Sequence, residues 1–286
     1  MVMTAYMEHK NLANETIDAA RAGEIAGNVH AVLDRVTAAE QAAGRKEGSV
    51  RLLAATKTRD VGEIMAAIDA GIRMIGENRP QEVQVKAPGL LRLAAERGFA
   101  LGVGGDATAD ASNAAASDAA AATNGTIPFH LIGQLQSNKI GKILPFVDTS
   151  ESVVSIELAE KFARRAVMRG ITVGVLLEVN ESGEASKSGC PASHAIDLAQ
   201  RIGNMGGLQL QGLMTIGAHV DDEATIRACF AHLRGTRDTI LASRAPGTEH
   251  CTELSMGMTH DMALAIAEGA TIVRVGTAIF GERAFI

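Results

Sequence analysis

The stretch Arg51-Leu-Leu-Ala-Ala-Thr-Lys-Thr58 decides the fold, because it contains a short apolar run that ends just before Lys57. Such a run between polar residues is typical of a strand that is buried on both faces. Parallel α/β folds place their chemistry at the carboxyl ends of these strands, where a desolvated amine can attack an aldehyde. Lys57 is therefore a candidate cofactor-binding residue. The alternative is a lysine that begins a solvated surface loop.

Helical patterns lie on both sides of this strand. Downstream, Asp60-Val-Gly-Glu63 resembles a capping box that begins a helix, and Gly71 can end that helix in the left-handed conformation. Upstream, apolar residues recur at helical spacing and predict one long amphipathic helix: Ile25, Val29, Val32, Leu33 and Val36. The chain is thus expected to have an extra N-terminal helix before its first strand.

Short apolar runs and helical patterns alternate along the rest of the chain. We expect eight strands, near 50–56, 72–76, 128–133, 145–149, 172–180, 207–216, 249–255 and 270–276, with helices in most of the gaps. Strict alternation of eight strands with helices is typical of a closed parallel barrel. The sequence therefore predicts an α/β fold, a single (β/α)8 TIM-type barrel formed by one domain over residues 1–286.

One segment interrupts this alternation. Between about 102 and 126 the chain consists almost entirely of Gly, Ala, Ser, Thr, Asn and Asp. So little large apolar surface cannot offset the entropy lost on ordering, which predicts a mobile surface insertion before the third strand. An alanine-rich helix over 114–122 is the alternative, since alanine is the best helix former.

The composition argues against nucleic-acid and membrane partners. The formal net charge of the 286 residues is −6, and no long basic run is present. No stretch reaches membrane-spanning length, and the N-terminus has no signal-peptide core. Cys190, Cys229 and Cys251 lack the close pairing of zinc ligands, so we expect reduced thiols and no metal site. A soluble, cytoplasmic protein is expected.

Two glycine-containing turns near the end of the chain are candidate phosphate sites. The last predicted strand leads into Gly276-Thr277, where exposed backbone N–H groups and a hydroxyl can face an anion. The strand before it ends at Ser255 and Gly257, ahead of Thr259, a candidate helix N-cap. Barrels often bind phosphate after their seventh and eighth strands. A purely structural role for each glycine is the alternative.

Other polar residues also lie near predicted strand ends. Arg274 shares its strand face with Gly276, so it is expected inside the barrel and needs a partner there. That partner is either a heteroaromatic ring nitrogen or a carboxylate such as Glu77 or Glu178. Asn78 can bind a ligand hydroxyl or form a turn. His130 is expected to be a hydrogen-bonded barrel histidine.

Together these segments resemble the pyridoxal phosphate homeostasis proteins, single-barrel relatives of the alanine racemase N-terminal domain. The order and spacing of the motifs, over about 50–283, make the resemblance specific. The matching motifs are Leu53-Ala-Ala-Thr-Lys-Thr58, Ile75-Gly-Glu-Asn78 with Gln81-Glu82, His130-Leu-Ile-Gly-Gln-Leu-Gln-Ser-Asn-Lys139, Glu184-Ala-Ser-Lys-Ser-Gly189, Gly212-Leu-Met214, Leu254-Ser-Met-Gly-Met258 with Asp261-Met262, and Val273-Arg-Val-Gly-Thr-Ala-Ile-Phe-Gly281. Gln134 and Gly217 depart from the family, since proline is frequent at both places.

The resemblance implies a site for pyridoxal 5′-phosphate (PLP), in which Lys57 forms a Schiff base with the cofactor aldehyde. The other implied cofactor-binding residues are Ser255, Gly257, Gly276 and Thr277 at the phosphate, Arg274 at the pyridine nitrogen, Asn78 near the ring, and Met214 packing on it. A guanidinium stays protonated and cannot protonate the ring nitrogen, so the ring is a poor electron sink. The implied function is PLP homeostasis, with PLP-dependent acceptor enzymes as further partners.

A PLP-dependent amino-acid racemase with weak activity is the alternative function. Two-base racemases need a second acid or base opposite the lysine, and in the family's racemases a tyrosine from a C-terminal domain supplies it. Tyr6, in the leader, is this sequence's one tyrosine. We therefore expect a protein that holds PLP without efficient catalysis.

Overall fold

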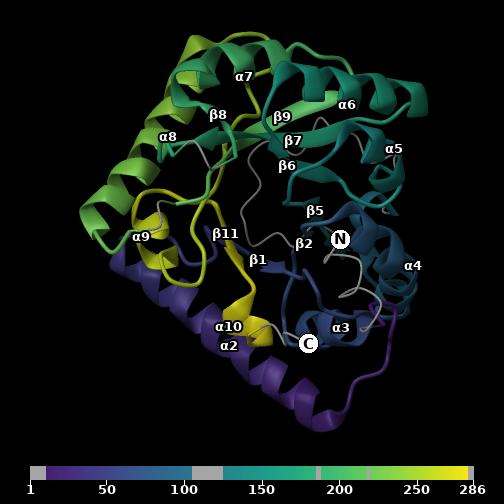
Figure 1. The fold of residues 1–286 in the computed structure, drawn as a ribbon. Coiled ribbons are helices and arrows are strands. Elements are labelled where there is room, and N and C mark those ends of the chain that lie inside the picture. Colours follow the sequence, from purple (N-terminus) through teal and green to yellow (C-terminus); the bar gives the residue numbers. More distant parts are fainter. Residues whose placement is uncertain (1–10, 105–124, 185–187, 218–219, 283–286) are drawn as a thin grey trace.

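The computed structural model describes residues 11–104, 125–184, 188–217 and 220–282 (Figure 1). Its centre is a closed barrel of eight parallel strands, which confirms the predicted fold class. In barrel order these strands are β1 (Arg51–Ala55), β2 (Ile75–Glu77), β5 (Phe129–Leu131), β6 (Thr149–Val153), β7 (Val173–Asn180), β9 (Leu208–Met214), β10 (Glu253–Ser255) and β11 (Ile272–Val275). Pairing of β11 with β1 and of β6 with β7 closes the ring.

Helices surround the barrel, as Figure 1 shows. They are α2 (Ala19–Ala42), α3 (Val61–Asp69), α4 (Pro80–Glu96), α5 (Ile140–Ile143), α6 (Ile156–Arg169), α7 (Ala195–Gly203), α8 (Glu223–Ser243), α9 (Met262–Ala267) and α10 (Thr277–Phe280). Smaller elements are β3 (Ala100–Leu101), β4 (Thr126–Ile127), β8 (Cys190–Pro191) and the 3₁₀ turns Gly102–Gly104, Ser137–Lys139 and Ala192–His194. Apolar faces of strands and helices form one continuous core between the two layers.

The N-terminal helix α2 flanks the barrel and does not plug it. It packs against α3, α9 and α10 on the outside (Figure 1), and Ile25, Val29, Val32 and Val36 are buried along one stripe. Asp18 caps its first turn. The predicted helical spacing is therefore confirmed, because apolar residues of this period form one stripe that faces the core.

One predicted strand lies elsewhere. We expected a strand over 145–149, whereas β6 runs from Thr149 to Val153. The apolar residues that suggested the earlier position pack from α5 and the following turn onto the core, as Val147 does. The actual strand, Thr-Ser-Glu-Ser-Val, is polar but buried at every position. Thr149 Oγ1 bonds to Gln211, and Glu151 bonds to His130 and Ser255, whereas Ser150 Oγ has no hydrogen-bond partner among the described residues.

Several local predictions can also be compared with the structure. Asp60 and Glu63 form both bonds of the capping box at the start of α3, and Gly71 follows that helix with φ of +118°. The predicted mobile insertion falls almost entirely on 105–124, outside the described residues. Cys190, Cys229 and Cys251 are free thiols. In the part of the chain that the structure describes, no helix has the length and apolar character needed to cross a membrane.

Candidate functional site

The barrel brings the predicted site residues to one end. Lys57 follows β1, Asn78 follows β2 directly, Met214 ends β9, Ser255 ends β10, and Gly276 follows β11. These five strands are consecutive neighbours in the ring, in the order β2-β1-β11-β10-β9. Because all are parallel, their carboxyl ends lie on the same face of the barrel. Residues that are up to 219 positions apart, counting from Lys57 to Gly276, therefore converge on one arc of that face.

The side chain of Asn78 has a feature that points to a bound ligand. Its backbone N–H donates to Glu77 Oε2 at 3.2 Å. Its side-chain Oδ1 atom is buried and has no hydrogen-bond partner among the described residues. A buried polar atom without a partner costs about 1–3 kcal/mol, so native proteins seldom keep one. A donor group on a bound molecule would satisfy it, which fits the predicted place of Asn78 beside a ligand ring.

The two glycine turns lie side by side. Gly257 has φ of +93°, and its carbonyl oxygen accepts from the backbone N–H of Arg274 at 2.9 Å. A Cβ atom on Gly257 would lie 2.5 Å from that of Ala265, so only glycine fits. A Cβ atom on Gly276 would lie 3.2 Å from the carbonyl oxygen of Ala55, two residues before Lys57. The turn after β11 thus closely approaches the end of β1.

Arg274 is buried beneath these turns. Its guanidinium donates to Ser255 Oγ at 2.7 Å and to the carbonyl oxygen of Thr215 at 2.8 Å. Burial lowers the pKa of Arg274, while the charges of Glu151, Asp261 and Glu178 oppose that effect. Among the described residues, no direct bond joins Arg274 to either carboxylate predicted as its partner, Glu77 or Glu178. Glu77 instead forms an ion pair with Lys86.

A buried polar chain continues from Arg274 across the barrel. Ser255 Oγ donates to Glu151 Oε2 at 2.6 Å, and Glu151 Oε1 lies 2.7 Å from His130 Nδ1. His130 Nε2 lies 3.5 Å from Asp148 Oδ1. The expectation of a hydrogen-bonded barrel histidine is confirmed. Sequence reasoning missed Glu151, because this residue lies beyond the strand predicted near 145–149 and inside the observed strand β6.

Glu151 and His130 shift each other's pKa values. Burial disfavours the imidazolium of His130, but its hydrogen bond to Glu151 and the charges of Asp148 and Glu151 outweigh burial and raise its pKa above 6.5. Burial also disfavours the carboxylate of Glu151, yet the bond and charge of His130, with Arg274 and Ser255, lower its pKa below 4.5. The charged form of each residue therefore stabilises the other.

This pair predicts how the stability depends on pH. The contribution of His130 is complete below its unfolded pKa of 6.5 and is lost as pH rises through the higher folded value. That of Glu151 is complete above its unfolded pKa of 4.5 and is lost as pH falls through the lower folded value. Both contributions are complete between pH 4.5 and pH 6.5, so we expect His130→Gln to lower the free energy of unfolding most in this range. Urea unfolding at several pH values measures this change. A cost that stays constant up to alkaline pH would contradict this linkage.

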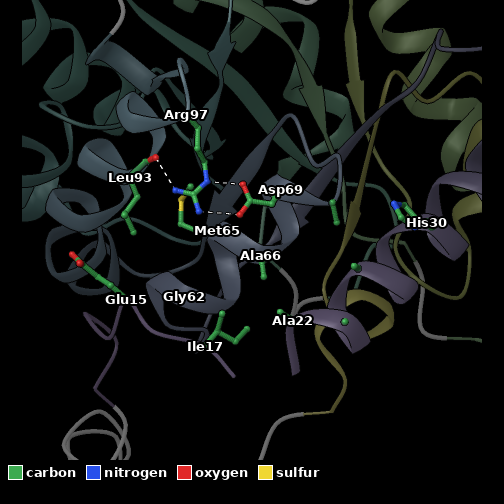
Figure 2. Close-up of a pocket in the computed structure, with 13 residues that line it drawn as sticks. Glu15, Ile17, Ala22, His30, Gly62, Met65, Ala66, Asp69, Leu93 and Arg97 are labelled. Carbon is green, nitrogen blue, oxygen red and sulfur yellow. Dashed lines mark hydrogen bonds and ion pairs between the residues drawn. The ribbon is translucent and has the colours of Figure 1, made fainter. Parts of the chain in front are cut away.

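A separate hollow lies on the outer surface. It has a volume of about 510 Å³ and lies between α2, α3 and α4 (Figure 2). Met65, Ala66 and Ile17 give it an apolar side, and the Arg97 guanidinium bonds to Asp69 at its edge, with Nε to Oδ1 at 2.6 Å. None of the predicted cofactor residues lines it. The candidate site and this hollow are therefore distinct.

Comparison with known proteins gives a consistent set of relatives. The family described as "Alanine racemase, N-terminal domain" matches residues 28–284. A pyridoxal phosphate homeostasis protein of Vibrio cholerae is 35% identical over 256 residues, which cover 90% of this chain and 95% of the relative. An unknown protein from Bifidobacterium adolescentis has 71% identity and a TM-score of 0.86, over 95% of this chain and 100% of that one. PipY of Synechococcus elongatus, solved with PLP bound, has 30% identity and a TM-score of 0.67, over 90% and 100%.

Proposed function

Because the chain belongs to the pyridoxal phosphate homeostasis protein family, within the alanine racemase N-terminal domain family, we propose that it reversibly holds PLP on Lys57. Holding the cofactor limits the concentration of free, reactive aldehyde. The observation that carries the proposal is the convergence of Lys57, both glycine turns and the unpartnered Asn78 Oδ1 on one end of the barrel. Such a set offers an amine, an anion site and a ring contact to a single molecule.

Each group would have its own part in binding. Lys57 would supply the nitrogen that bonds to the aldehyde carbon, with the aldehyde oxygen leaving as water, and hydrolysis would reverse the step. Gly257, Gly276 and Thr277 would hold the phosphate through backbone N–H groups and a hydroxyl. Asn78 Oδ1 would accept from the ring hydroxyl, and Met214 would pack on the ring. Ser255 would act at the phosphate, and its bond to Arg274 would help to orient that guanidinium.

The chemistry that PLP supplies when bound is stabilisation of a carbanion, which is stronger when its ring nitrogen is protonated. Arg274 would face this nitrogen. A guanidinium keeps its proton, and the bonds to Ser255 and Thr215 fix its orientation. The site would therefore favour retention of the cofactor over broad amino-acid chemistry.

Reductive trapping tests this function. The purified protein is incubated with PLP, reduced with borohydride and digested, and the modified peptide is identified by mass spectrometry. We expect visible absorbance before reduction and a reduced adduct on Lys57 in most molecules. A protein that stays colourless and acquires no adduct at Lys57 would contradict the proposal.

The racemase alternative has its own measurement. Incubation of the PLP-loaded protein with single enantiomers of alanine should give turnover well below the ordinary enzymatic range of roughly 1 to 1,000 per second. Turnover within that range would overturn the homeostasis function. We also propose that the protein delivers PLP to acceptor enzymes and that it is located in the cytoplasm. Its free cysteines support such a reducing compartment. Activation of an apo enzyme by the loaded protein would test delivery.

A further inference from the structure

Two side chains from α4 hold the backbone on both sides of Lys57. The Lys86 ammonium donates to the carbonyl oxygen of Thr56 at 3.0 Å. The backbone N–H of Thr58 donates to Glu82 Oε2 at 2.7 Å. Lys57 thus lies between two residues that are each bonded to a helix outside the barrel strands. Its backbone cannot move far without breaking one of these bonds.

Lys86 is completely buried, and its remaining bonds go to two carboxylates. Its Nζ atom lies 2.5 Å from Glu77 Oε1 and 2.8 Å from Glu82 Oε2. With Thr56, these contacts use all three hydrogens of the ammonium. Lys86 therefore has no donor left for a ligand. An ammonium is costly to bury and is tolerated only with such complete pairing.

The backbone conformation of Thr58, the residue after Lys57, depends on this cluster. Thr58 has φ of +66°, a left-handed conformation that is rare and unfavourable for a β-branched residue. Surrounding bonds must hold such a residue in place. The contact of its N–H with Glu82 is a bond of this kind. It fixes a sharp change of direction immediately after Lys57.

One of these carboxylates, that of Glu77, also contacts the second loop of the site. Glu77 Oε1 accepts from Thr56 Oγ1 at 2.7 Å, and Glu77 Oε2 accepts from the backbone N–H of Asn78 at 3.2 Å. One buried cluster of Lys86, Glu77 and Glu82 therefore holds the loop that carries the amine and the loop that carries the unpartnered amide oxygen. The two loops follow neighbouring strands, β1 and β2.

We propose that the Lys86–Glu77–Glu82 cluster is the positioning device of this site, which presets Lys57 and Asn78 relative to each other for the bound aldehyde. The proposal rests on the proposed function, since the aldehyde is the cofactor's. None of the three side chains is a catalytic residue, because their contacts among the described residues go to the backbone, to Thr56 Oγ1, to Arg79 and to one another. Their effect is on how often the Lys57 amine is in a reactive geometry.

Glu82→Gln tests this role with a side chain of the same shape. The rate of covalent capture of PLP is followed by stopped-flow absorbance over a range of pH. The rate at the alkaline plateau is compared, because there the Lys57 amine is neutral in every variant. We expect Glu82→Gln to lower this plateau roughly 10- to 100-fold, the scale of a misplaced reactive group. The same slowing is expected with pyridoxal, which has no phosphate.

Glu96→Gln is the matched control. Glu96 lies on the same helix, is exposed and pairs with Arg92, so its loss should leave the rate unchanged. If Glu82→Gln does not fold, Glu77→Gln takes its place. Burial raises the pKa of the Glu77 carboxyl, so a neutral amide is better tolerated there. A folded Glu82→Gln or Glu77→Gln that captures both aldehydes at the wild-type rate would overturn the positioning role, whereas a wild type without an adduct at Lys57 would overturn the proposed function.

Discussion

Lys57→Ala is expected to abolish the borohydride-fixed cofactor adduct. The amine is the group that bonds to the aldehyde carbon, and alanine has no nucleophile to replace it. The phosphate turns at Gly257 and Gly276 remain, so the variant should still bind PLP without a covalent link. We expect its affinity to fall by on the order of 100-fold, about 2.8 kcal/mol. Equilibrium dialysis gives the affinity, and mass spectrometry after reduction gives the adduct.

Lys142→Ala is the control for this change. Lys142 is exposed on α5 and carries no predicted contact with the cofactor. Adventitious labelling of surface amines would be equal in the two variants, whereas specific labelling disappears with Lys57→Ala alone. An undiminished stoichiometric adduct in Lys57→Ala would place the reactive amine elsewhere.

Glu151→Gln is expected to destabilise the barrel interior strongly. Glu151 is fully buried, and its two oxygens contact Ser255 and His130. Loss of its charge leaves His130 without its main partner and removes a negative charge that stabilises the Arg274 guanidinium. Breaking a buried ion pair by removing one partner costs about 3–5 kcal/mol. Urea unfolding, with the same slope in both proteins, measures this difference.

Two comparisons show whether the loss comes from the buried chain. Asp197→Asn breaks an exposed pair with Arg201 and should cost less than about 1 kcal/mol. In a double-mutant cycle, His130→Gln should cost less in the Glu151→Gln background than in the wild type, because the shared interaction is already lost. Additive costs would mean that Glu151 and His130 act independently.

The sequence predicted those features that depend on local pattern. Apolar runs located seven of the eight strands, at least approximately, and helical spacing located α2. The capping residues of α3 were also evident from their order alone. The strand over Thr149–Val153 was misplaced, because four of its five residues are polar, and Glu151, for example, is buried against Ser255 and His130 from other strands. A hydropathy pattern carries no information about such partners.

Lys86 shows the same limit at the site. Glu82 and Lys86 are four residues apart, a spacing that is typical of an exposed pair on a helix surface. In the structure both are buried, and Lys86 has no exposed surface. Their environment depends on where α4 packs against the loops after β1 and β2. The positioning cluster could therefore be seen only in three dimensions.

By itself, the sequence determined the barrel, its flanking N-terminal helix and the order of candidate cofactor residues, because strand and helix periodicity are properties of short segments. Tertiary structure alone decided which charges are buried together. Ser255 and Glu151, for example, are 104 residues apart and meet because the ring of strands closes. Whether a buried charge is paired depends on such long-range closure, and its pairing sets its protonation and the groups that it can hold in place.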